Sequence, residues 1–176
     1  MSLISRRSFV GASGLMLAGL TVPWTASANS VATIHMKSNE DGSHVWFDPI
    51  GLYVEPGTTI RWILDGNIHT ATAYHPTNDG HSLRIPEGAE PWDSGYLMMN
   101  GASFEATLTV PGVYDYFCAP HEHGGMVGRI VVGAVSGPGA GPFDESVPEL
   151  ARCAFPKPDD IMQKKMIPAS APVGCS

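Results

Sequence analysis

Charged residues, and basic residues above all, are scarce in this 176-residue chain. Lys and Arg number 10 against 17 Asp and Glu, and charged residues make up only 15% of the sequence. The formal charge of −7 argues against a general nucleic-acid binder, because such a protein needs a basic face. The chain also lacks a glycine-rich phosphate loop and an internal repeat. The sequence therefore gives no support to nucleic-acid binding, to a phosphate-loop nucleotide site or to a repeat architecture.

Turn-forming residues, by contrast, are plentiful. The chain contains 20 Gly and 15 Pro. Many turn-formers combined with little charge suit short strands joined by turns better than long charged helices. The length fits one domain with some additional sequence.

The N-terminal segment reads as a targeting sequence. Residues 5–10 (Ser-Arg-Arg-Ser-Phe-Val) form a twin-arginine pattern, an uncharged apolar run follows over 11–24, and Ala26-Ser27-Ala28 matches a small-x-small cleavage site. The run is short for a bilayer span and contains a proline. No cysteine precedes Cys118, which argues against a lipoprotein anchor. We predict that residues 1–28 are a twin-arginine signal peptide, cleaved after about Ala28, and that the mature protein is periplasmic without stable membrane insertion.

Cleavage at this point would make the protein more acidic. The signal peptide contains Arg6 and Arg7 and no acidic residue, so the mature chain would carry 8 basic and 17 acidic residues, a net charge of −9. Such a protein is attracted to basic patches on a partner, at a rate that salt reduces.

The chain from about residue 30 to residue 133 has the pattern of β-structure. The expected strands are 31–36, 58–64, 69–74, 103–110, 113–118 and 127–132. In the strand over 103–110, apolar residues alternate with polar ones, which suits a strand with one buried side. Strands this short and this regularly spaced predict an antiparallel sandwich or barrel.

Two stretches depart from the strand pattern. Residues 74–102 form a polar stretch of nearly thirty residues, and a loop of this length is functional or carries short elements of its own. Residues 134–142 read as a linker, and 147–155 could form a short helix with Pro at its first turn. The C-terminal part is too small for a core of its own, so we expect it to pack on the sandwich.

The three cysteines divide into one candidate ligand and one candidate pair. Cys118 is a candidate metal ligand, for the spacing described in the next paragraph, which leaves Cys153 and Cys175. In an oxidising compartment a disulfide between Cys153 and Cys175 is reasonable, and it would close a loop over the proline-rich end of the chain. The sequence also leaves open that these two cysteines are unpaired.

Metal-binding residues concentrate in the segment 116–126 (Tyr-Phe-Cys-Ala-Pro-His-Glu-His-Gly-Gly-Met). The spacing Cys118-x2-His121-x4-Met126 allows one loop to curl around a single ion. Thiolate, imidazole and thioether form a soft ligand set that suits copper, whose blue sites use two His and one Cys with a long axial Met. The second histidine must come from elsewhere, because a single tight loop cannot surround the metal. The His-Glu-His sequence is no zinc-protease motif, since the helix and the i, i+4 histidine pair are missing.

These patterns resemble a known family. Tyr114-x-Tyr116-x-Cys118-x-Pro120-His121-x4-Met126-x-Gly128 is similar to the copper loop of the plastocyanin/azurin family, the cupredoxins. Trp62 followed by His69-Thr70 resembles the upstream strand of that family with its first histidine ligand. The resemblance implies an all-β, Greek-key β-sandwich with a short, partly helical C-terminal extension. We therefore expect a cupredoxin domain over 29–133 and a linker with a Pro-rich extension over 134–176.

The resemblance also implies a ligand set and a function. His69 and His121 would bind copper through ring nitrogens, Cys118 would bind as thiolate, and Met126 would be the weak axial ligand. Similar proteins carry single electrons by cycling one type 1 (blue) copper between Cu(I) and Cu(II). We expect a monomeric periplasmic electron carrier rather than an enzyme, with a c-type cytochrome or a copper oxidoreductase as partner.

One residue departs from the family pattern, and two histidines leave their roles open. Many relatives carry Asn directly after the first histidine, where it joins the two ligand segments; here the residue is Thr70, whose hydroxyl can make some of those bonds. His75 also lies upstream and is the rival of His69. His123 lies inside the ligand loop, as a solvent-facing residue or as one that faces a partner or supports a ligand. The remaining histidines read as surface residues: His35, His44 and His81.

Two other functions remain alternatives. Extra histidines and methionines, such as His75, Met98 and Met99, would suit a periplasmic copper store or chaperone. A copper enzyme would need a second copper site, and one domain without a second complete ligand set argues against it unless oligomers build that site.

Overall fold

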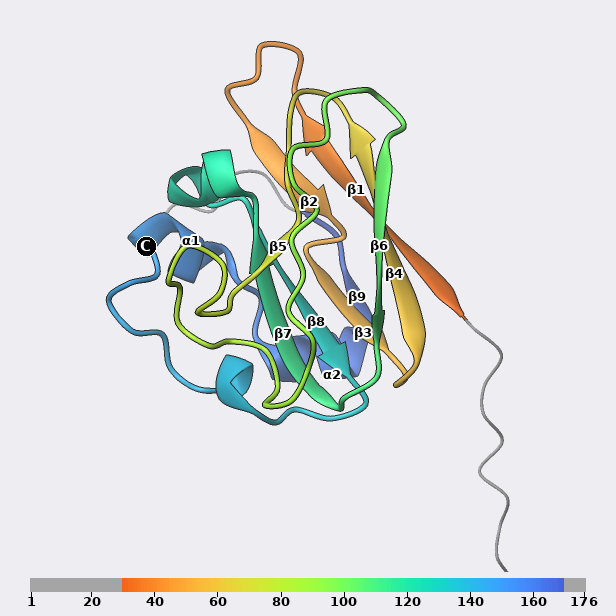
Figure 1. Ribbon diagram of the computed structural model, residues 1–176, viewed down its shortest axis with the longest axis vertical. Helices are drawn as coiled ribbons and strands as arrows, with labels where there is room; N and C mark the ends of the chain where they lie inside the picture. The colour runs from red at the N-terminus through yellow and green to blue at the C-terminus, as the bar shows by residue number, and fades with distance from the viewer. Residues whose placement is uncertain (1–29, 170–176) are drawn as a thin grey trace, which may run out of the picture.

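The computed structural model describes residues 30–169, which form two stacked β-sheets (Figure 1). The first sheet has the order β2–β1–β4–β6 and consists of β1 (Val31–Ser38), β2 (Val45–Asp48), β4 (Thr58–Asp65) and β6 (Ser103–Leu108). The second has the order β5–β7–β8–β3–β9 and consists of β3 (Gly51–Val54), β5 (Thr72–Ala73), β7 (Gly112–Phe117), β8 (Val127–Val132) and β9 (Met166–Ile167). The all-β sandwich expected from the sequence is confirmed.

Both sheets are mixed, so the expectation of a purely antiparallel sandwich is wrong. β1 pairs with β4 in parallel, and β3 pairs with β8 in parallel; the other neighbours are antiparallel. Neither parallel pair is consecutive in the chain, because the chain crosses to the second sheet for β3 and returns to the first for β4. Alternation of apolar residues sets the buried face of a strand but carries no information about the direction of a neighbouring strand.

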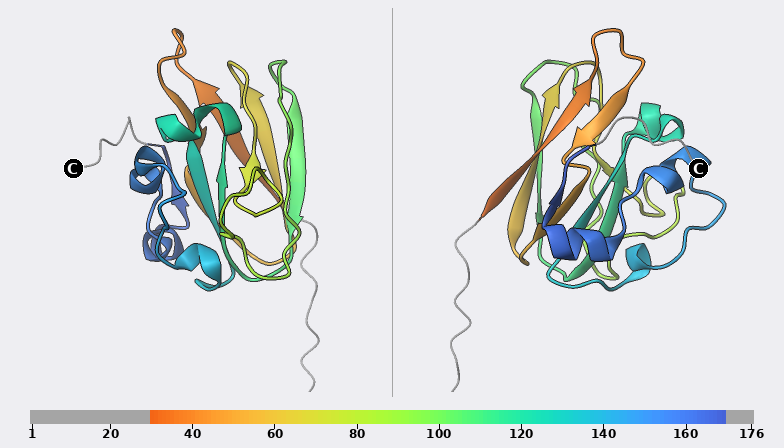
Figure 2. Two further views of the ribbon diagram at one scale, coloured as in Figure 1. Left: turned by 60° about the vertical axis from the view of Figure 1, so that its left-hand side comes forward. Right: turned by 180° about the vertical axis from the view of Figure 1, so that it is seen from behind.

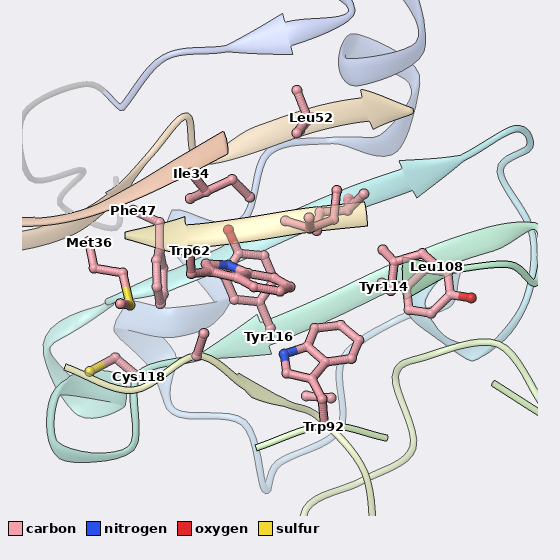
Figure 3. Close-up of a cluster of buried hydrophobic side chains, with 14 of the residues drawn as sticks. Ile34, Met36, Phe47, Leu52, Trp62, Trp92, Leu108, Tyr114, Tyr116 and Cys118 are labelled. Atoms are coloured by element: carbon pink, nitrogen blue, oxygen red, sulfur yellow. The ribbon is translucent and has the colours of Figure 1, made fainter. Parts of the chain in front are cut away.

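An aromatic core fills the space between the sheets. On β4 every second residue is buried, including Ile60, Trp62 and Leu64. The Trp62 ring lies 5.5 Å from that of Tyr116 on β7 and 5.4 Å from that of Trp92, which comes from the long loop after β5. Figure 3 shows these rings packed together, with Cys118 at one end of the cluster. The loop over 74–102 therefore contributes to the core as well as crossing the surface.

The C-terminal extension packs on the outer face of the second sheet (Figure 2). It contains the 3-10 turn η2 (Pro138–Ala140) and the helices α1 (Glu149–Ala154) and α2 (Pro158–Lys164). Its last strand, β9, pairs antiparallel with β3. The expected packing and the expected first helix are found, whereas α2 and β9 were not predicted.

A buried ion cluster fastens the segment that the sequence suggested as a linker. Asp115 is fully buried on β7 and accepts hydrogen bonds from Arg84 Nε at 2.8 Å and Arg129 Nε at 2.7 Å. Both guanidinium groups also donate to the carbonyl oxygen of Gly139 in η2, at 3.0 and 3.3 Å. The ring of Phe143 lies 4.0 Å from the Arg84 guanidinium carbon. Residues 134–142 are thus held on the sandwich by charge-assisted hydrogen bonds.

Some predictions concern residues outside 30–169. The signal peptide over 1–28 and one partner of the Cys153–Cys175 disulfide, Cys175, lie outside the described residues. Both stay predictions. Within the described part of the chain, no helix has the length and apolar character needed to cross a membrane.

Candidate metal centre

Three of the four candidate ligands lie in one tight loop at the end of the sandwich. Cys118 directly follows β7, the 3-10 turn η1 (Ala119–Gly124) carries His121, and Met126 directly precedes β8. The Cys118 amide donates to the Met126 carbonyl at 3.0 Å, and the Met126 amide donates to the His121 carbonyl at 3.1 Å. Gly125 ends the turn with a φ of 85°, a left-handed conformation that favours glycine. The backbone therefore folds the two ends of the loop onto each other.

The fourth candidate, His69, comes from the segment between β4 and β5. It is fully buried and is fixed by a bridge to the long loop, since its amide and that of Leu97 exchange hydrogen bonds with the opposing carbonyls at 3.3 and 2.9 Å. Nothing in the sequence near His69 indicates this pairing, because Leu97 lies far along the chain.

The donor atoms of three residues converge on one point. His69 Nδ1 and His121 Nδ1 lie 3.2 Å apart, and Cys118 Sγ lies 3.6 Å from the first and 3.3 Å from the second. In the triangle that these three separations define, the point equidistant from all three atoms lies about 2 Å from each, close to the metal–nitrogen and metal–thiolate bond lengths of about 2.0–2.3 Å known for zinc. Among residues 30–169, His69, Cys118 and His121 are the group of His, Cys, Asp and Glu side chains placed to hold an ion. The geometry therefore fits a first-row transition metal.

Burial sets the protonation state of the three donors. Burial, with a smaller contribution from nearby His121, lowers the pKa of His69 to about 4, and burial also lowers the pKa of His121. Both imidazoles are therefore neutral at pH 7 and can coordinate. Burial raises the pKa of the Cys118 thiol to about 11, so metal binding at neutral pH has to release its proton.

The match to a family model decides what kind of metal centre this is. The model for copper-binding proteins of the plastocyanin/azurin family matches residues 34–133, more than half of the chain. The chain belongs to this family. The matched region contains both ligand segments, so the centre of this cupredoxin is a copper site.

Individual relatives agree. A pseudoazurin from Methylorubrum extorquens is 31% identical over 129 residues, which cover 72% of this chain and 77% of the relative. A chloroplast plastocyanin from Tetradesmus obliquus is 29% identical over 129 residues, which cover 69% of this chain and 78% of the relative. Among solved structures, a pseudoazurin from Sinorhizobium meliloti superimposes with a TM-score of 0.55 at 28% identity, covering 71% of this chain and 90% of that one.

Thr70 joins the two ligand segments of this cupredoxin, as its hydroxyl allowed us to expect. Its amide donates to Cys118 Sγ at 3.3 Å, and its hydroxyl accepts a hydrogen bond from the Ala119 amide at 2.8 Å. The same hydroxyl lies 3.0 Å from that of Thr72, which donates to Asp93 at 2.8 Å. The bonds link the His69 segment to the start of the ligand loop, with a hydroxyl in place of an amide side chain.

The structure places the other histidines away from the donor group. His75 Nδ1 accepts a hydrogen bond from the Thr77 amide at the start of the long loop, so the histidine that meets Cys118 is His69 and not its rival. His123 is exposed on η1. His81 differs from the surface position predicted for it, because its side chain is only 15% exposed and contacts Glu122.

The contacts of Glu122 were not predicted from the sequence. Its side chain is buried beside His121 and bonds to Tyr74 and His81, more than forty residues earlier in the chain. A glutamate in a polar loop is ordinarily read as solvent-facing, and no local signal identifies partners so distant in sequence.

Proposed function

We propose that this cupredoxin is a periplasmic type 1 copper protein that carries single electrons between redox partners. The observation that carries the proposal is the convergence of His69 Nδ1, His121 Nδ1 and Cys118 Sγ within 3.6 Å of one another. Two imidazoles and one thiolate are the ligands of a blue copper site. The similarity to proteins named plastocyanin and pseudoazurin supports the same function.

In this proposal each ligand has a separate role. His69 and His121 bind through Nδ1, Cys118 binds as thiolate, and Met126 supplies the weak axial thioether. Met126 is 1% exposed and belongs to the same apolar cluster as Cys118, which suits that role. The copper supplies one-electron exchange between Cu(I) and Cu(II). The fold fixes the donors close together, so little rearrangement accompanies each electron transfer.

Exchange with a partner takes place at the His121 end of the molecule. His69, Cys118 and Met126 are buried, whereas His121 is only half-buried. Exposed apolar residues stand in the neighbouring loops, with Met98 67% exposed one residue after the Leu97 that pairs with His69. A small apolar contact of this kind suits a transient redox encounter. The net charge of −9 for the mature chain favours a basic partner, such as a c-type cytochrome, or a copper oxidoreductase.

Titration of the apoprotein with copper tests the proposal. We expect one equivalent of copper to bind and an intense visible thiolate-to-copper band to appear. The Cu(I)/Cu(II) redox potential of the loaded protein should be reversible. Binding of several equivalents without that band would indicate a copper store instead. Turnover of nitrite or oxygen in the presence of a reductant would indicate an enzyme. Either result would overturn the carrier assignment.

Partner choice and export have their own tests. The rate of electron exchange with a basic c-type cytochrome should fall as ionic strength rises, and a rate that does not depend on salt would contradict charge attraction. We also propose that the mature chain begins near Asn29 after cleavage of the signal peptide, and that it is a monomer. Mass determination of the periplasmic protein and its sedimentation test these two points.

A further inference from the structure

Glu122 is a buried acid inside the ligand loop. It directly follows His121 in η1, and its side chain is only 8% exposed. A carboxylate is costly to bury unless hydrogen bonds or a charged partner replace the lost water. The position of Glu122 therefore depends on what its two oxygens contact.

Both oxygens have partners from one distant segment. Tyr74 Oη donates to Glu122 Oε1 at 2.6 Å, and His81 Nε2 lies 3.1 Å from Glu122 Oε2. His81 is itself fixed, because its Nδ1 lies 2.9 Å from the Asn78 carbonyl oxygen and its ring stacks on that of Phe117 at 4.3 Å. Two immobilised side chains thus hold one carboxylate by two points, which restricts its rotation as well as its position.

The backbone around Glu122 connects these side-chain contacts to the candidate ligands. The Glu122 carbonyl accepts the Gly125 amide at 2.8 Å, and the carbonyl of His121 accepts the Met126 amide at 3.1 Å. A shift of Glu122 would therefore move both hydrogen bonds that close the turn. His121 and Glu122 therefore share the hydrogen bonds that order η1.

The C-terminal extension supports the same arrangement from outside. Tyr74 and Phe117 belong to an apolar cluster that includes Ala151 and Phe155 of the extension. α1 packs directly on η1, as Figure 1 also shows, and a Cβ atom on Gly125 would lie 3.3 Å from the Leu150 carbonyl oxygen. The extension thus covers the Tyr74 side of the network and presses against the end of the turn.

We propose that Glu122, whose carboxylate is bound by Tyr74 and His81, is a positioning residue. It holds the η1 turn, and thereby the imidazole of His121, in place for copper. Tyr74 and His81 act through Glu122 and do not touch the donor atoms. The inference rests on the proposed copper site, but the hydrogen bonds that it concerns are all made between protein groups. The apoprotein therefore offers a test of its own.

The first experiment measures amide hydrogen exchange in the apoprotein. Tyr74→Phe removes one hydroxyl that bonds Glu122 and keeps the ring, so exchange of the Gly125 and Met126 amides should accelerate by about tenfold. The matched control is Tyr114→Phe, which removes a hydroxyl bonded to the Val110 carbonyl at 2.7 Å in a different turn. The control should leave both amides unchanged. Equal exchange in the two variants would overturn the proposal.

The second experiment follows the copper-loaded protein. Glu122→Ala should change the copper hyperfine splitting in the paramagnetic-resonance spectrum and speed copper loss to a chelator, whereas Glu122→Gln should restore most of both properties because an amide retains an acceptor for Tyr74. Spectra and loss rates identical to the wild type in Glu122→Ala would contradict a positioning role. Failure of the wild-type protein itself to show a blue copper spectrum would instead refute the proposed function, so the two failures are distinguishable.

Discussion

Replacing Thr70 with valine removes the hydroxyl that joins the two ligand segments and keeps the shape of the side chain. The hydroxyl accepts the Ala119 amide at 2.8 Å and lies 3.0 Å from that of Thr72. In Thr70→Val the Ala119 amide loses its acceptor, while the amide of residue 70 still donates to Cys118 Sγ. The change thus isolates the link between the His69 segment and the ligand loop.

The magnitude follows from the contacts. Loss of a neutral hydrogen bond costs about 0.5–1.5 kcal/mol, and an amide left unpaired in the interior costs about 1–3 kcal/mol. Because Ala119 is exposed, water can reach its amide in part, so we expect a loss of about 1–2 kcal/mol. For a protein of this size the unfolding midpoint should fall by roughly 2–8 °C. Thermal and denaturant unfolding of the apoprotein measure both quantities.

The matched control is Thr59→Val. The Thr59 hydroxyl pairs with that of Thr107 at 2.8 Å on the exposed face of the first sheet, far from the ligand loop in sequence. A surface change of this kind should alter stability by no more than about 0.5 kcal/mol. Thr70→Val should also release copper to a chelator faster than the control. The reasoning is refuted if the two variants match in stability and in copper release.

Three further predictions concern the ion cluster, the pH dependence and the cysteines. Asp115→Asn leaves two buried guanidinium groups without a carboxylate and should lower the free energy of unfolding by about 3–5 kcal/mol in denaturant titrations; a loss under about 1 kcal/mol would contradict the buried cluster. Burial lowers the pKa of His69 from 6.5 to about 4, so as pH falls the unfolded chain binds a proton at this histidine before the folded chain does. The stability of the apoprotein should therefore fall as pH drops from about 6.5 to 4 and stay level just above that range. A flat stability profile below pH 6.5 would refute this prediction. Cys153 and Cys175 should resist alkylation in the denatured, unreduced protein and react after reduction; alkylation of both without reductant would exclude the disulfide.

The extent to which the strands were predictable depends on how much each relies on local sequence. Residues 127–132 were predicted as a strand and form β8 with the same limits, because a run of branched apolar residues is bounded by turn-formers. Residues 45–48 and 51–54 were missed, since four-residue strands show too little alternation to stand out. The strand expected over 69–74 shrinks to Thr72–Ala73. Its first residues pair with the long loop and the ligand loop instead, a tertiary preference that local pattern does not carry.

The metal site was predictable in its ligands and unpredictable in its supports. Cys118, His121 and Met126 share a loop whose spacing is visible in the chain, and the resemblance pointed to His69. The hydrogen bond from Tyr74 to Glu122 joins residues 48 positions apart, and only the structure shows that they meet. Ligand identity is thus carried by residue type and spacing, whereas ligand support is carried by the fold.

The most direct test of the central claim compares the visible and paramagnetic-resonance spectra of the wild-type protein and the Cys118→Ala variant, each with one equivalent of Cu(II). The wild type should show an intense thiolate-to-copper band and the narrow copper hyperfine splitting of a type 1 site, and Cys118→Ala should lose the band. Persistence of that band in Cys118→Ala, or its absence from the wild type, would contradict the account.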